Sequence, residues 1–118
     1  MGISPEQLRE RMQAFAIRTV NLFRALPLRP DAQIMGKQLL RSATSVGANY
    51  RAACRGRSRA EFVAKLGIVT EEADESVYWM ELLVATRVMS ERRMQQLMKE
   101  GRELTAIFTA AQSTSRKR

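Results

Sequence analysis

Apolar side chains recur along most of the chain at alternating steps of three and four residues, the spacing of one face of an α-helix. In the first helical segment these positions are Leu8, Met12, Phe15, Thr19, Leu22 and Leu26. Ser4, followed by Pro5 and by Gln7 three residues after the cap, is a capping box that predicts where this helix begins. Pro27 and Pro30 cannot continue a helical backbone, so we expect the helix to end there in a short extended link.

A second helix is expected from Asp31, a good N-cap, to about Ala53. Its core-facing positions are Met35, Leu39, Ser42, Val46, Asn49 and Ala53. Small side chains dominate residues 42–54, which predicts a tight seam against a neighbouring helix or subunit. Close packing should offset the roughly 1 kcal/mol that Gly47 costs in mid-helix. Asn49, assigned to the same seam, either supplies a specific buried hydrogen bond or lies exposed.

A third helix is expected from Arg59 to Met89, after Gly56 ends the second helix and Ser58 opens another capping box. Its stripe is Phe62, Leu66, Val69, Ala73, Ser76, Met80 and Leu83. From Val77 onward this helix is apolar on most sides, unlike an ordinary surface helix. We therefore expect its own bundle or another subunit to bury several faces, with Trp79 and Leu83 as packing residues.

Ser90 caps a fourth helix, whose stripe is Met94, Leu97, Met98, Gly101, Leu104, Phe108 and Ala111. The last residues, 113–118, are polar and basic, and we expect them to fray. Residues 1–112 then form one domain. Four helices with short connections predict an all-α fold, an antiparallel up-down-up-down four-helix bundle.

The chain of 118 residues contains no histidine, which excludes Ser-His-Asp and Cys-His catalysis, haem ligation and zinc sites with imidazole ligands. Cys54 is the one cysteine, and we interpret it as a small packing residue of a protein in a reducing compartment. The acidic run 71–75 matches no calcium loop, so a metal-dependent nuclease using Glu71, Glu72 and Glu75 is disfavoured. We expect no cofactor, no metal and no enzymatic activity.

The first twenty residues carry five charged side chains where a signal peptide needs an apolar core. The most apolar run, residues 77–89, is too short and too charged to cross a bilayer. We therefore expect a cytoplasmic protein without a membrane partner.

Basic side chains outnumber acidic ones by twenty to twelve, a formal charge of +8 that favours polyanionic partners. Six basic residues and one acidic residue fall within residues 31–60. The densest cluster joins the second and third helices and comprises Arg51, Arg55, Arg57 and Arg59. Guanidinium groups bind phosphates bidentately, so this cluster, together with Lys37 and Arg41, is the candidate nucleic-acid interface. In the alternative, the four arginines pair with Glu61, Glu71 or Glu72, or remain solvated.

The segment 42–62, SATSVGANYRAACRGRSRAEF, resembles a family of bacterial four-helix bundles that are often encoded in intervening sequences of 23S rRNA genes. The following segments KLGIV (65–69), EEADE (71–75) and YWMELL (78–83) extend the similarity. The resemblance implies a homopentamer around a central axis. It also implies a relationship to the accessory protein of diversity-generating retroelements, a basic pentamer that works with a reverse transcriptase and binds nucleic acid. The family has no catalytic residues to carry over.

Two functions are therefore expected. In the first, the chain is an oligomeric, non-enzymatic bundle that binds RNA or DNA, RNA in preference, through its basic surface. In the second, it is a protein-interaction scaffold, for example an accessory subunit for a reverse transcriptase, and its charge serves solubility or steering. Replacing the four clustered arginines separates the two functions.

Overall fold

The computed structural model describes the backbone of residues 2–117 and the side chains of residues 2–116. Four α-helices make up nearly all of this part of the chain: α1 (Pro5–Arg24), α2 (Pro30–Cys54), α3 (Arg59–Ala85) and α4 (Glu91–Lys117). The described residues include no β-strand. The predicted all-α fold of four helices is thus confirmed.

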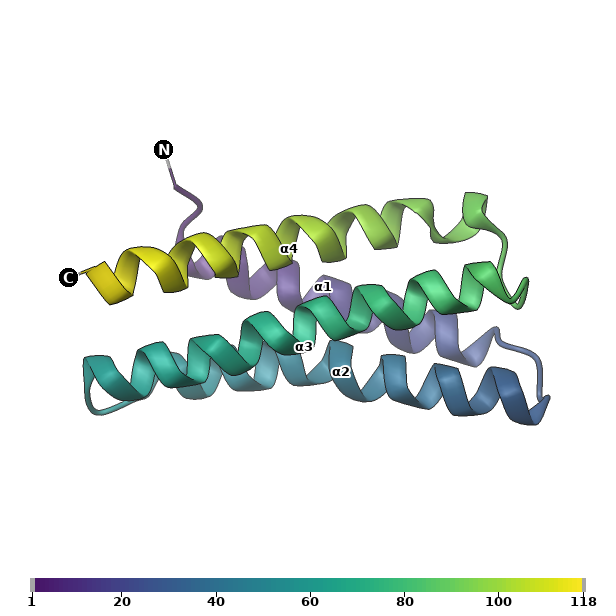
Figure 1. Ribbon diagram of the computed structural model, residues 1–118, viewed down its shortest axis with the longest axis horizontal. Helices are drawn as coiled ribbons and strands as arrows, with labels where there is room; N and C mark the ends of the chain where they lie inside the picture. The colour runs from purple at the N-terminus through teal and green to yellow at the C-terminus, as the bar shows by residue number, and fades with distance from the viewer. Residues whose placement is uncertain (1, 118) are drawn as a thin grey trace.

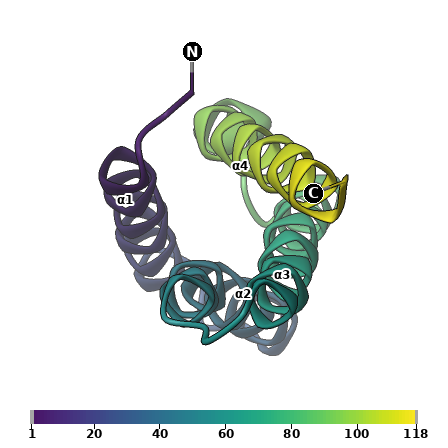
Figure 2. The same ribbon diagram turned by 90° about the vertical axis from the view of Figure 1, so that its left-hand side faces the viewer.

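The helices lie side by side along the long axis, and each short connection reverses the direction of the chain (Figure 1). Viewed from one end, they follow one another in chain order around the bundle (Figure 2). The contact between α2 and α3 is the most extensive and that between α1 and α4 the least. One end of the bundle therefore brings together the start of α1, the α2–α3 turn and the end of α4.

The core consists of the residues that the helical spacing predicts. Twelve side chains are almost completely buried, and they come from all four helices: Phe15, Phe108, Met12, Leu39, Leu66, Met80, Leu83, Met94, Leu104, Val46, Val69 and Thr19. One predicted position of α2 is wrong, because Tyr50 is buried and packs against Phe108 while Asn49 is only half-buried. Asn49 donates to the carbonyl of Ser45 in its own helix, so it links no neighbouring helix.

Three predicted helix starts are confirmed by their capping hydrogen bonds. Ser4 and Gln7 form the reciprocal capping box at the start of α1. At α4, the hydroxyl of Ser90 accepts from the backbone N–H of the residue three positions on, at 3.2 Å. At α3, Ser58 accepts from the N–H of Glu61, whose carboxylate in turn accepts from the N–H of Arg57 at 2.6 Å. These bonds satisfy donors that every helix start leaves free.

Two predicted helix ends are wrong. At the start of α2, Arg29 takes the cap position and Pro30 the first turn, because the fixed backbone angle of proline suits that turn. Asp31, the predicted cap, lies in the first turn and pairs with Arg29 at 3.5 Å. The second error concerns the C-terminal end of α3, which lies at Ala85 and not at Met89.

The early end of α3 is caused by Arg87, whose backbone adopts the left-handed conformation with φ 64°. The N–H of Arg87 donates to the carbonyl of Val84 at 2.9 Å, and the N–H of Val88 donates to that of Leu83 at 3.0 Å. This is the Schellman arrangement that usually contains glycine. The chain then folds back, and Met89 turns inward to close the end of the core.

The final segment also differs from its prediction. Helix α4 continues to Lys117, so residues 113–117 are helical instead of frayed. Arg118 lies outside the described residues. Because α4 ends at the same end of the bundle as the α2–α3 turn (Figure 1), its extension lengthens the bundle at the end that holds the arginine cluster.

Candidate nucleic-acid interface

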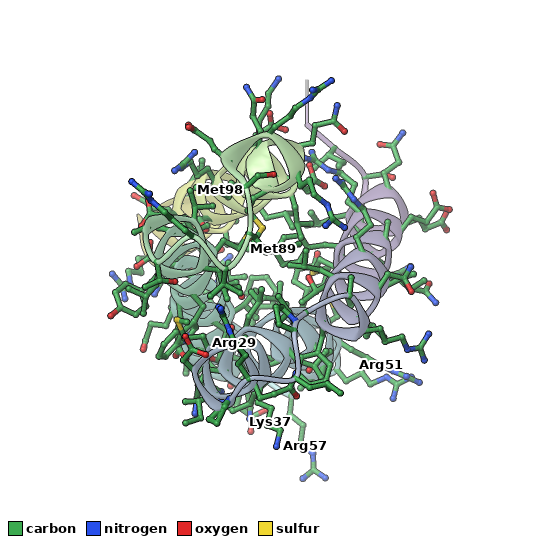
Figure 3. The ribbon with its side chains drawn as sticks, turned by 90° about the vertical axis from the view of Figure 1, so that its right-hand side faces the viewer. Arg29, Lys37, Arg51, Arg57, Met89 and Met98 are labelled. Atoms are coloured by element: carbon green, nitrogen blue, oxygen red, sulfur yellow. The ribbon has the colours of Figure 1, made fainter. Side chains whose placement is uncertain are left out.

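The four clustered arginines lie at one end of the bundle. Arg51 is on the last turn of α2, and Arg55 follows that helix directly. Arg57 lies in the turn, and Arg59 is the first residue of α3. All four are exposed, and Figure 3 shows that Arg51 and Arg57 project away from the bundle. The fold therefore presents these guanidinium groups to solvent instead of burying them against its own core.

Among the described residues, no carboxylate lies within ion-pair distance of any of these four arginines. Glu61, one of the predicted partners, instead accepts from the backbone N–H of Arg57. Glu72, another, pairs with Arg41. Within the described part of one chain, the arginines of the cluster thus pair with none of Glu61, Glu71 and Glu72 and remain solvated, which leaves their charge available for an anion.

Helix α1 adds a fifth arginine, Arg9, which sequence reasoning missed. Arg9, Arg51, Cys54 and Arg55 line one hollow of about 360 Å³ at the surface between α1 and α2. The antiparallel course of two neighbouring helices brings the start of one beside the end of the other, and this relation could have indicated Arg9. We call the five residues Arg9, Arg51, Arg55, Arg57 and Arg59 the basic end.

A second hollow of about 320 Å³ extends from the first between the same helices, and Arg9 and Arg51 border both. Its remaining lining residues are apolar, small or amide side chains: Met12, Gln13, Ala16, Gly47 and Ala48. We call the two hollows together the α1–α2 groove. Gly47 lies in this groove and not in a tight seam, because the nearest atom to a side chain at Gly47 would be Met12 Cβ at 3.8 Å. The close approach occurs instead at Gly36, where a Cβ would overlap Leu26 and lie 3.0 Å from Phe23.

Tyr50 connects the groove to the core. Its ring is buried against Phe108, while its hydroxyl interacts with Cys54 and with the charge of Arg9. Burial and the hydrogen bond with Cys54 raise the pKa of Tyr50 to about 12, against a smaller lowering by Arg9. Tyr50 is therefore neutral at physiological pH and adds no negative charge beside the arginines.

The other two predicted contact residues, Lys37 and Arg41, lie apart from the basic end. Lys37 precedes Arg51 by fourteen helical residues, or about 21 Å along α2, although it also projects outward (Figure 3). Arg41 is held by Glu72 at 2.9 Å and by Glu75 on α3. The structure thus brings neither of them to the arginine cluster.

Trp79 and Leu83 lie on the inner side of α3. Leu83 is fully buried, and Trp79 packs partly buried against the core. The indole N–H of Trp79 donates to Glu75 at 3.0 Å. This bond is the largest cause of a lowered pKa of Glu75, and Arg41 lowers that pKa further, against an opposing rise from burial. The network fixes Arg41 as a link between α2 and α3.

The part of the chain that the structure describes holds no group of three metal-ligating side chains placed to bind an ion. Of the acidic run, Glu72 and Glu75 both pair with Arg41. None of the four described helices is both long enough and apolar enough to span a membrane.

The comparison with protein families finds one match, described as 23S rRNA-intervening sequence protein, over residues 7–110. A solved structure is also similar, with a TM-score of 0.82 and 36% sequence identity. It is the 1.70 Å crystal structure of a protein of unknown function from the S23 ribosomal protein family of Bacteroides thetaiotaomicron. The alignment covers 88% of this chain and 96% of that one. No curated protein matches the chain.

Proposed function

Since the chain belongs to the 23S rRNA-intervening sequence protein family, we propose that it is a cytoplasmic, non-enzymatic protein that binds nucleic acid, RNA in preference. In this proposal the basic end contacts phosphates of the nucleic-acid backbone. Such contacts position a protein on its ligand, and the counterions that they release supply much of the affinity.

One observation carries the proposal: five guanidinium groups from α1, α2 and α3 lie at one end of the bundle without a carboxylate partner among the described residues. Some other arginines of the structure do pair across helices, as Arg11 with Glu100 and Arg41 with Glu72 show. Unpaired guanidinium groups gathered at one end repel one another, and an anion relieves that repulsion. A phosphate backbone supplies anions in series.

The test is fluorescence anisotropy of a labelled, structured RNA with the wild type and with the variant R51Q/R55Q/R57Q/R59Q. Each lost phosphate contact lowers the slope of log K against log salt by roughly 0.7 to 0.9. We therefore expect the slope to fall by about 3 and the affinity at physiological salt to fall at least about tenfold.

A matched control separates local contact from loss of net charge. The variant R24Q/R92Q/R93Q/K99Q removes the same number of charges from exposed positions outside the basic end. It should bind RNA nearly as tightly as the wild type. If the two variants weakened RNA binding equally, the proposal would be contradicted, because the net charge of the protein and not the basic end would then determine the affinity.

A second candidate function, the protein-interaction scaffold, is favoured by exposed apolar side chains. The large ones among the described residues are Ile17, Leu28, Ile34, Ile68 and Tyr78. Solvent-exposed apolar side chains are suited to contact another chain when they gather in a patch.

We propose that the chain assembles as a homopentameric ring, as the family resemblance implies. Under the scaffold function, we propose that its partner is an enzyme such as a reverse transcriptase.

Light scattering coupled to size exclusion tests the assembly. The wild type should elute with five times the chain mass of 13.4 kDa, and the variant I68E/Y78E should elute with a lower mass if α3 lies in the interface. A monomeric wild type at micromolar concentration would contradict the ring. Under the scaffold function, R51Q/R55Q/R57Q/R59Q changes only the salt dependence of partner binding.

A further inference from the structure

The α1–α2 groove has a charge distribution that differs from the rest of the basic end. Three arginines line it: Arg9 on α1, Arg51 on α2, and Arg55 directly after α2. Neither hollow of the groove has a carboxylate in its lining. Arg57 and Arg59, by contrast, lie outside this lining, in the turn and at the start of α3.

The groove is also concave, and its size and its hydrogen-bond donors suit a small anion. Its two hollows, of about 360 and 320 Å³, fall within the range of small-molecule sites. Each guanidinium carries five N–H donors and no acceptor, so the three arginines at the groove supply donors and no competing acceptor for an anion. The hydroxyl of Tyr50, whose pKa is raised to about 12, adds no negative charge at physiological pH.

We propose that the α1–α2 groove is a binding site for a terminal phosphate monoester of a nucleic-acid strand, an inference that rests on the proposed function. A monoester offers three free oxygens and a charge of about −1.5 to −2 at neutral pH. An internal phosphodiester offers two free oxygens and a single charge. Three arginines from two helices, with no carboxylate among the lining residues, therefore match the end of a strand better than its interior.

The floor of the groove provides space for the nucleotide that carries this phosphate. Gly47 and Ala48 on α2 face Ala16 on α1 across it. Gly47 has no steric reason to be glycine, since a Cβ there would meet only ordinary contact at 3.8 Å. Small residues at positions 16, 47 and 48 leave the groove between Arg9 and Arg51 open.

The test compares one short single-stranded RNA in three forms: with a 5′-phosphate, with a 3′-phosphate, and with hydroxyls at both ends. Binding is measured by anisotropy at physiological salt. We expect one phosphorylated form to bind at least about tenfold more tightly than the hydroxyl form, and the form that does so identifies the end. Inorganic phosphate at millimolar concentration should reduce that advantage.

Four variants separate the groove from general electrostatics. R9Q/R51Q/R55Q should lose the preference for the phosphorylated end, whereas R24Q/R92Q/K99Q, which loses the same charge elsewhere, should keep it. G47L should also lose it, because a leucine fills the groove and leaves every arginine in place. G47A serves as its folding control and should keep most of the preference.

Three results would overturn the inference, and they are distinguishable. Equal affinity for all three RNA forms, with RNA binding intact, refutes the terminal-phosphate site and leaves the proposed function standing. Absence of RNA binding at any salt refutes both. A preference that survives in R9Q/R51Q/R55Q also refutes the site, because the phosphate would then bind elsewhere.

Discussion

Arg11 of α1 forms a bidentate ion pair with Glu100 of α4, with Nη2 2.6 Å from Oε1 and Nε 3.0 Å from Oε2. Glu103, one turn further along α4, lies 3.0 Å from the same Nη2. The Glu100 hydrogen bond is the largest cause of a raised pKa of Arg11. The pair joins the two helices that share the least extensive contact in the bundle. It therefore fixes α4 against α1 where apolar packing contributes little.

A double-mutant cycle measures this contact. R11Q and E100Q should each lower the free energy of unfolding, and the coupling between them should be about 1 kcal/mol, because both groups are partly shielded and the geometry is bidentate. Urea unfolding of the wild type, the single variants and the double variant provides the cycle. Strict additivity of the two losses would show that the pair contributes nothing beyond solvation.

Two glycines of α2 should respond in opposite ways to alanine. G47A should raise the free energy of unfolding by up to about 1 kcal/mol, because alanine favours the helix and meets no close atom. G36A should lower it by about 1 kcal/mol net, because overlap with Leu26 and Phe23 outweighs the helical gain. Thermal unfolding of both variants checks the signs. A stabilising G36A would mean that Leu26 moves aside at little cost.

The α3–α4 turn should be stabilised by glycine. Arg87 adopts the left-handed conformation, which costs an L-residue roughly 1–2 kcal/mol. Replacing Arg87 by glycine removes this cost, but the greater conformational freedom of glycine in the unfolded chain offsets part of the gain. R87G should therefore raise the free energy of unfolding by about 0.5–1 kcal/mol. The urea midpoint is the readout. A lower midpoint would indicate that the Arg87 side chain itself stabilises the turn.

Tyr50 should give the protein an alkaline limit. Its pKa rises from the ordinary 10.0 to about 12 in the folded state, so the unfolded chain loses this proton first as pH rises. This difference in pKa contributes up to about 2 kcal/mol to the free energy of unfolding. The contribution is fully present below pH 10 and is lost as the pH approaches 12. Y50F keeps the ring and removes the titrating hydroxyl, so its stability should fall less between pH 9 and pH 11.5. Parallel losses in the two proteins would contradict the burial of the hydroxyl.

Sequence reasoning predicts the elements of this fold well because their signals are local. The hydroxyls of Ser4, Ser58 and Ser90 each bond within three residues of themselves, so the cap is visible in the sequence. The core stripes follow from helical spacing at most positions, and the step from Asn49 to Tyr50 is misplaced.

What the sequence did not predict depends on the register between helices. The sequence does not distinguish Gly36 from Gly47, since both lie within the second helix. Only the neighbouring side chains in the folded protein show that Gly36, and not Gly47, lies at a close approach. Arg41 belongs to the same basic run as Arg51, yet the placement of α3 beside α2 brings Glu72 to it. Arg9 joins the candidate site through α1, far away in the chain.

The central claim, that the basic end binds RNA, is tested most directly by a salt series. A structured rRNA fragment and an unrelated duplex DNA of equal length are titrated with the wild-type protein by anisotropy, up to physiological ionic strength and beyond. The account predicts that the rRNA fragment stays bound near roughly 150 mM salt with a preference of about tenfold or more. If the two ligands dissociate together as salt rises, the charge of the basic end is non-specific and the account is contradicted.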